Sequence, residues 1–245
     1  MQLFGQTRTR VSISHALIAP DGHVPSSFPA WENATGFVMI SPAMGANLSQ
    51  ILITFDQENG SATFPADEHE HVLYVEAGEC EIILQDKSLH LATTGFIFIP
   101  AYTPFTLQGD PLTRITLFRK IFESHPELEV PPLVHGLASE ITGEPFLGNP
   151  RALLKTLLPI DPRYDLAMNI FTYQPGATLP FVETHIMEHG LLMLAGQGIY
   201  RLDENYYPVT AGDVIWMAPY CPQWFVAMGD EPASYLYYKD VHRLP

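Results

Sequence analysis

The chain has 245 residues, of which 47% are hydrophobic and 16% are charged, and its formal net charge is −15. This composition is globular rather than disordered, and the length is sufficient for one large β domain or two smaller domains. A charge this negative argues against a nucleic-acid surface or docking on anionic lipid, so we expect a small-molecule or protein partner.

The N-terminal stretch carries Arg8 and Arg10 but no apolar core long enough for a signal peptide, and no later segment has the length of a membrane span. The two cysteines, Cys80 and Cys221, do not form a disulfide framework, although a single disulfide between them stays open. We therefore expect a protein of the reducing cytoplasm that does not associate with membranes.

Short strands are predicted from Val72 to Phe105, where apolar and β-branched residues alternate between Gly, Pro, Asp and Asn. Just before them, Asp67, His69 and His71 stand among further acidic residues. This cluster is either a solvated acidic edge with one inherited histidine or a metal site. The first interpretation is favoured, because partner donors are missing in the strands that follow.

The middle of the chain is expected to connect two halves. The stretch 126–132 is rich in proline, and residues 143–150 look like a loop. The segment Asn149–Leu158 is the clearest exception to the strand pattern and predicts a short helix or turn. We accordingly divide the chain into an N-terminal domain (1–125), a linker (126–160) and a C-terminal domain (161–245).

The second half repeats the first. The segment that begins at Gly190 aligns without a gap onto the one that begins at Val72, and His189 follows His71 by 118 residues. In both copies an apolar strand is followed by a glycine turn, a polar hairpin and a strand that ends at proline. This is the order of the two cupin motifs, so we predict an all-β bicupin of two tandem double-stranded β-helix (jelly-roll) barrels.

Metal-binding side chains gather in the second copy. Glu183, His185 and His189 are two and four residues apart, and even spacing places side chains on one face of an extended chain. The first copy keeps only the last of them, as His71. The C-terminal barrel is therefore the expected metal site, and the N-terminal barrel is expected to be structural or to offer a surface to a partner.

A fourth ligand is expected in the second motif, where the chain carries Gln223. One carboxylate, two imidazoles and one amide oxygen suit Mn²⁺ or another divalent ion better than tetrahedral zinc, and leave positions for water or substrate. The first copy carries Phe105 at this place, which provides no donor.

The last strand carries a candidate for substrate binding. Tyr235, Tyr237 and Lys239 alternate by two, so they can share one face. A lysine that faces a barrel interior must be paired or must meet an anion, and Asp240 points the other way. We interpret Lys239 as a contact for an anionic substrate; the alternative is a lysine exposed and paired at the surface.

The motifs GQGIYRL, GDVIWMAP and PQW, the ending YLYYKDVHR and the opening TRTRVSISHALIAPDGHVPS resemble (S)-ureidoglycine aminohydrolase over nearly the whole chain. That family consists of manganese bicupins of purine and allantoin catabolism. The resemblance implies hydrolytic release of ammonia from ureidoglycine to give (S)-ureidoglycolate. It assigns Mn²⁺ to Glu183, His185, His189 and Gln223, substrate contacts to Gln223, Tyr200, Tyr235 and Lys239, and catalysis to the last two.

Other functions stay open at this point. A different metal bicupin, such as a dioxygenase, decarboxylase or sugar isomerase, usually carries three histidines and a glutamate, which Gln223 and Lys239 count against. A non-enzymatic bicupin would be a small-molecule sensor or a storage protein, yet no basic helix for DNA is evident. We also expect a homo-oligomer, because bicupins often associate through exposed sheet edges.

Overall fold

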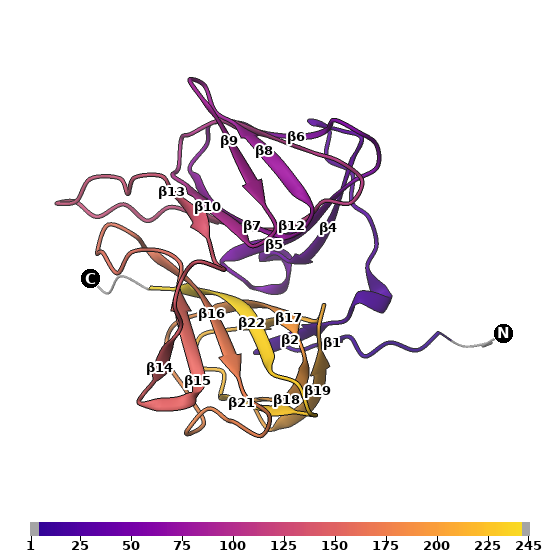
Figure 1. Ribbon diagram of the computed structural model, residues 1–245, viewed down its shortest axis with the longest axis vertical. Helices are drawn as coiled ribbons and strands as arrows, with labels where there is room; N and C mark the ends of the chain where they lie inside the picture. The colour runs from indigo at the N-terminus through magenta and orange to yellow at the C-terminus, as the bar shows by residue number, and fades with distance from the viewer. Residues whose placement is uncertain (1–4, 242–245) are drawn as a thin grey trace. The chain divides into compact units, whose positions relative to one another are not determined.

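A computed structural model describes residues 5–241 of the chain, and nearly all of its regular structure is β-strand. The chain divides into two compact units, and each unit contains one copy of the repeat (Figure 1). The N-terminal unit comprises residues 24–142 and 155–168. The C-terminal unit comprises the described residues up to 23, together with 143–154 and 169–240.

The N-terminal unit is a barrel of two antiparallel sheets. One sheet has the order β13-β10-β7-β12-β5-β4, and the other has the order β3-β6-β11-β8-β9. Their inner faces enclose an aliphatic and aromatic core, because alternate residues of each strand point inward. The elements are β3 Trp31–Glu32, β4 Ala34–Ile40, the 3₁₀ helix η2 Pro42–Met44, β5 Leu48–Phe55, β6 Gly60–Phe64, β7 His69–Ala77, β8 Glu79–Ile83, β9 Ser88–Ala92, β10 Gly95–Ile99, β11 Phe105–Gly109, β12 Arg114–Ile121 and β13 Val134–Leu137.

The C-terminal unit is a second barrel. Its large sheet has the order β1-β2-β20-β17-β22-β16-β15-β14, and its small sheet has the order β19-β18-β21. Its core is rich in tyrosine and phenylalanine. The elements are β1 Arg10–Val11, β2 His15–Ile18, the 3₁₀ helix η1 Pro20–Gly22, β14 Glu144–Phe146, β15 Asn149–Thr156, β16 Leu166–Tyr173, β17 His189–Ala195, β18 Gln197–Leu202, β19 Asn205–Thr210, β20 Val214–Met217, β21 Gln223–Met228 and β22 Ala233–Asp240.

The backbone repeats at the predicted offset. Gly78 and Gly196 both end the first motif with a positive φ, 73° and 71°. A Cβ on Gly196 would lie 2.5 Å from the Pro232 carbonyl oxygen, so the position requires glycine for space as well as conformation. Tyr102 and Tyr220 share a φ of 64°. The predicted bicupin fold is therefore confirmed.

The division of the chain differs from the one expected. The described residues up to His23 belong to the C-terminal unit, where β2 pairs with β20, and Figure 1 shows β1 and β2 among its strands. The expected linker contains strands β13, β14 and β15. The short helix or turn predicted at Asn149–Leu158 is wrong, because Asn149–Thr156 form strand β15 beside β14. Sheet pairing here overrides the helix propensity of Ala, Leu and Lys.

A partly buried ion pair attaches the N-terminal segment to its barrel. Arg8 donates from Nη1 and Nη2 to the two carboxylate oxygens of Asp213, at 2.7 and 2.6 Å. Asp213 is fully buried, whereas the Arg8 side chain is 44% exposed. The neighbouring Arg10 donates only to backbone carbonyls of the same segment.

Replacing Arg8 with alanine is therefore expected to lower the free energy of unfolding by about 1–2 kcal/mol. Asp213 would then be buried with only the Thr210 amide as a donor, and the partial exposure of Arg8 keeps the loss below that of a fully buried pair. Urea unfolding of R8A and of the control R10A measures the difference. Equal stability of the two variants would contradict the role of the pair.

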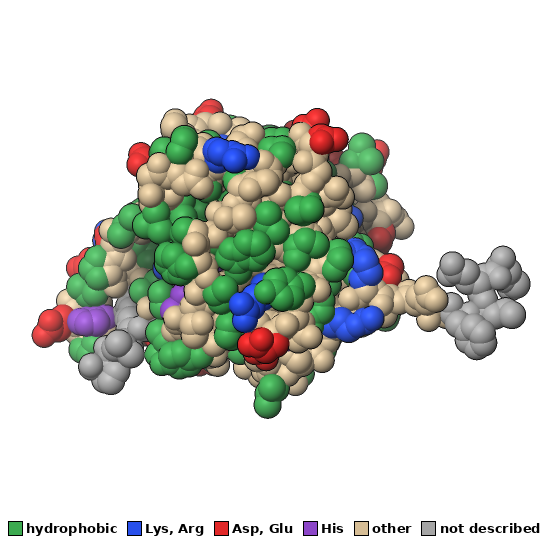
Figure 2. Space-filling model, turned by 90° about the horizontal axis from the view of Figure 1, so that it is seen from below, with side chains coloured by type: hydrophobic (Ala, Val, Ile, Leu, Met, Phe, Trp, Pro, Cys, Tyr) green, Lys and Arg blue, Asp and Glu red, His purple; other side chains and the backbone are tan. Residues whose placement is uncertain are grey.

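On the face of the molecule shown in Figure 2, Lys and Arg side chains are interspersed with hydrophobic and neutral polar side chains. Within residues 5–241, no helix is long and apolar enough to cross a membrane. Cys80 and Cys221 are both buried and free.

Candidate metal centre

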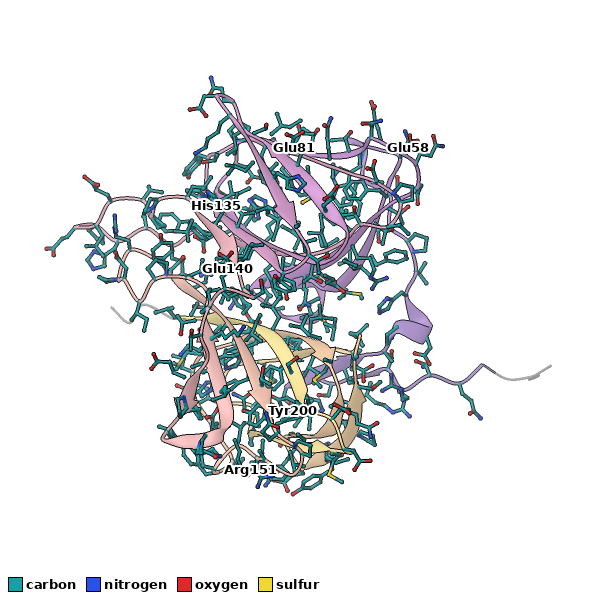
Figure 3. All side chains as sticks on the ribbon, viewed as in Figure 1. Glu58, Glu81, His135, Glu140, Arg151 and Tyr200 are labelled. Carbon is teal, nitrogen blue, oxygen red and sulfur yellow. The ribbon has the colours of Figure 1, made fainter. Side chains whose placement is uncertain are left out.

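A cavity of about 230 Å³ lies inside the C-terminal barrel. Every side chain to which the sequence assigned a site role lines it, together with a ring of aromatic and apolar residues. Figure 3 places Tyr200 among the strands of this barrel. The assigned residues that line the cavity are Glu183, His185, His189, Tyr200, Gln223, Tyr235 and Lys239.

The segment that carries Glu183 and His185 is not a continuous strand. Glu183 forms an isolated bridge with Gln223, in which each backbone N–H donates to the other carbonyl at 2.9 Å. The Tyr220 amide donates to the His185 carbonyl at 2.7 Å, and β17 begins only at His189. The expected single extended face is therefore wrong, and these backbone bonds turn Glu183 and His185 toward the cavity instead.

Three of the four candidate metal ligands lie close to the fourth, His185. Its Nε2 lies 3.3 Å from Nε2 of His189, 2.9 Å from Nε2 of Gln223 and 3.9 Å from Oε2 of Glu183. Ligand atoms that share one ion at about 2.0–2.2 Å stand about 3–4 Å apart. The Gln223 amide can present either its nitrogen or its oxygen on this side. These separations fit a shared ion.

Burial sets the protonation of these groups. It lowers the pKa of His185, and the nearby Lys239 ammonium lowers it further. It lowers the pKa of His189 to about 3, assisted by His185 and Lys239. Both imidazoles are therefore neutral at pH 7 and have a lone pair to offer, as metal binding requires. Burial also raises the pKa of the Glu183 carboxyl, while Lys239 opposes that shift.

The donor set fits a divalent ion in its chemistry. Among the described residues, no three His, Cys, Asp or Glu side chains meet in metal-binding geometry. Oε2 of Glu183 lies 3.9 Å from Nε2 of His185, and the fourth donor is the amide of Gln223. One carboxylate, two neutral imidazoles and an amide form a mixed nitrogen and oxygen set of the kind that manganese accepts.

Hydroxyl groups form the wall beside the donors. Tyr235 is 3% exposed, and its hydroxyl lies 3.2 Å from that of Tyr173. Burial raises the pKa of Tyr200, Tyr235 and Tyr237, so all three phenols stay protonated at neutral pH. They can therefore donate hydrogen bonds to a bound molecule but do not act as bases.

Lys239 contributes the positive charge of the cavity. It is the register partner of His189 in the β17–β22 ladder, which fixes its place beside the donors. Across the part of the chain that the structure describes, no carboxylate forms an ion pair with it. The alternative of a surface lysine with a surface partner is therefore not what the structure shows, and the cavity offers an ammonium group to an anionic ligand.

Several lining residues were not foreseen from the sequence. Phe146 comes from β14, in a stretch taken as a loop, and Phe171 comes from β16. Phe171 stacks on Tyr237 with ring centroids 5.6 Å apart. Alternation along Leu166–Tyr173 could have placed Phe171 and Tyr173 on the inner face, but nothing marked them as neighbours of the donors.

Glu188, which lies between His185 and His189 in the sequence, is fully buried, and its carboxylate accepts a hydrogen bond of 2.6 Å from the indole of Trp216. Glu188 does not line the cavity, so it is not one of the donors.

Comparisons with known proteins agree with this architecture. The family model described as "Cupin domain" matches residues 169–238, which include all four donors. The chain is 38% identical to a probable (S)-ureidoglycine aminohydrolase of Oryza sativa subsp. japonica, over 98% of this chain and 77% of the relative. It is 36% identical to the (S)-ureidoglycine aminohydrolase of Arabidopsis thaliana, over 98% of this chain and 80% of that one.

A solved structure has the same fold. The protein Ylba of E. coli superposes with a TM-score of 0.86 at 31% identity, and the match covers 98% of this chain and 96% of the other. The likeness therefore extends over both barrels.

Proposed function

Because the chain belongs to the (S)-ureidoglycine aminohydrolase family, we propose that it releases ammonia from (S)-ureidoglycine and forms (S)-ureidoglycolate in the C-terminal cavity. The observation that carries this proposal is the meeting of Glu183, His185, His189 and Gln223 with Lys239 in one cavity. Such a space suits a small substrate that carries an amine, a ureido group and a carboxylate.

Glu183, His185, His189 and Gln223 would hold the metal, and we propose Mn²⁺ or another divalent ion. A bound ion supplies a positive centre that polarises an oxygen ligand and activates water. The neutral imidazoles and the carboxylate offer it their lone pairs, and the amide keeps the donated charge low. His189 and Gln223 are buried, whereas Glu183 and His185 keep part of their side chains exposed at the cavity.

The remaining polar groups would bind and orient the substrate. Lys239 offers its ammonium group to the substrate carboxylate or ureido oxygen. Tyr200 and Tyr235 donate hydrogen bonds from phenols that burial keeps protonated. In the net reaction a C–N bond to the amine breaks, a C–O bond to water forms, and the departing nitrogen leaves as ammonia. Lys239 and Tyr235 are the candidates to deliver its proton.

A stoichiometric assay distinguishes this reaction from the alternatives. Freshly generated ureidoglycine should yield one ammonia for each molecule consumed, with the ureido carbonyl retained in ureidoglycolate by ¹³C NMR. Consumption of oxygen would indicate a dioxygenase and release of CO₂ a decarboxylase. Conversion without ammonia would indicate an isomerase, and binding without turnover a sensor or storage protein. Any of these four results would contradict the proposal.

The hydroxyl of Tyr173 is expected to position Tyr235. Tyr173→Phe should lower kcat/KM about three- to tenfold, since one hydrogen bond contributes about 0.5–1.5 kcal/mol. Metal content should stay unchanged. Tyr164→Phe is the matched control, because that hydroxyl bonds the Pro132 carbonyl in the other barrel. A rate equal to that of the control would rule out the positioning role.

The cellular setting is also a proposal. We propose that the enzyme works in the cytoplasm, in purine and allantoin catabolism, and that it assembles as a homo-oligomer. The two free buried thiols of Cys80 and Cys221 support a reducing compartment. Sedimentation analysis of the purified chain tests the assembly.

A further inference from the structure

The N-terminal barrel has a cavity of its own, of about 200 Å³. It lies entirely within that barrel, and its lining includes three aromatic rings and two basic side chains. A drug-sized ligand occupies roughly 300–1,000 Å³, so only a smaller molecule fits here. Among the lining residues are Phe28, Trp31, Ile51, Phe64, His71 and Arg119.

His71 is the first of the two basic side chains of this cavity. The side chain is 2% exposed, and neither ring nitrogen has a hydrogen-bond partner among the described residues. The rings of Phe64 and Phe105 contact it edge-on, with centroids 5.4 and 5.1 Å away. A buried polar group without a partner is destabilising, and a ligand that hydrogen-bonds it removes that penalty.

Arg119 is the second basic side chain of this cavity. It faces His71 in the β7–β12 ladder, as Lys239 faces His189 in the β17–β22 ladder. Both barrels therefore place a cation beside the same histidine. Sequence alignment hid this equivalence, because Arg119 and Lys239 are 120 residues apart rather than 118.

The guanidinium group of Arg119 has a free donor. Its Nη2 contacts Asp67 Oδ2 at 2.5 Å and His69 Nδ1 at 2.9 Å, whereas its buried Nε has no partner among the described residues. Asp67 is thereby engaged, which leaves no carboxylate and only one free imidazole for a metal. The cavity thus offers hydrogen-bond donors and a partly balanced positive charge next to flat apolar walls.

We propose that this cavity binds a small carboxylate whose body is flat and apolar. The carboxylate accepts hydrogen bonds from Arg119 and from His71, and the body packs against Trp31 and Phe64. The site is separate from the metal centre in the other barrel, and it does not depend on the function proposed there. The N-terminal barrel is then a binding module rather than only a scaffold.

Benzoate is the probe, and the neutral benzamide is its matched analogue. Trp31 lines the cavity, so titration of the full-length protein with benzoate should change its fluorescence saturably, and benzamide should bind at least tenfold more weakly. The change should disappear in Trp31→Phe. Arg119→Gln should weaken benzoate binding at least tenfold, whereas Arg114→Gln, an arginine on the same strand outside the cavity, should not.

A second measurement does not depend on a variant that folds poorly. In protein labelled with ¹⁵N in the histidine rings, benzoate should shift the resonances of His71, which are assigned by their absence in His71→Gln. The proposal is overturned if benzoate leaves these resonances unmoved. It is also overturned if the fluorescence change persists in Trp31→Phe, or if folded Arg119→Gln binds benzoate as the unaltered protein does.

Discussion

Replacing Glu183 with alanine is expected to remove the metal ion and to lower the rate of ammonia release by roughly a thousandfold or more. Among residues 5–241, Glu183 is the only carboxylate that lines the cavity, so its loss would leave two neutral imidazoles and an amide around the ion. A metal contributes several kcal/mol to charge stabilisation, and each 1.4 kcal/mol is about a factor of ten in rate. Elemental analysis after gel filtration measures the metal, and the ammonia assay measures the rate.

His69→Gln is the control for this variant, because it removes an imidazole from the acidic cluster of the N-terminal barrel, which the sequence left open as a metal site. We expect it to retain the metal content of the unaltered protein. A Glu183→Ala protein that keeps one equivalent of metal would show that the ligand assignment is wrong. Loss of metal in His69→Gln would place the ion in the other barrel.

Replacing Lys239 with methionine is expected to lower kcat/KM by about a hundredfold to a thousandfold while the metal stays bound. Methionine fills a similar volume but has no charge, so the substrate carboxylate would enter the cavity without its cationic partner. Truncating one member of a buried charge pair costs roughly 2–5 kcal/mol. Steady-state kinetics and metal analysis of the same preparation separate the two effects.

Arg201→Met is the control for this variant. Arg201 follows Tyr200 on β18, and its guanidinium contacts Asp203 and Glu204 instead of lining the cavity. It should keep full activity. If Lys239→Met loses its metal, Lys239 supports the metal centre rather than the substrate. If its kinetics match those of Arg201→Met, Lys239 has no part in the reaction.

Local sequence patterns were sufficient to predict the fold and most of the site. The gapless repeat predicted two similar barrels. The even spacing of Tyr235, Tyr237 and Lys239 predicted that the three side chains share one inward face of the last strand. Both follow from strand geometry, which depends only on neighbouring residues. Glu183 and His185 were also correctly grouped, although backbone bonds to the loop and strand around Gln223, rather than a single strand, bring them together.

What the sequence did not reveal depends on contacts between distant segments. Nothing local shows that Arg8 pairs with Asp213, 205 residues away, or that β15 is a strand rather than a helix. Phe146 enters the cavity from a strand that reads as a loop. The correspondence of Arg119 with Lys239 was not visible in the sequence alignment, because the two residues are offset by two positions from the repeat. Strand register shows it, since each residue is paired with the equivalent histidine.

The central claim is that one metal ion in the C-terminal barrel is required for the release of ammonia. It is tested most directly by removing metal with a chelator, confirming the loss by elemental analysis, and measuring ammonia from ureidoglycine before and after Mn²⁺ is restored. We expect the metal-free protein to be inactive and the rate to return in full at one ion per chain. A metal-free protein that releases ammonia at the original rate would contradict the claim.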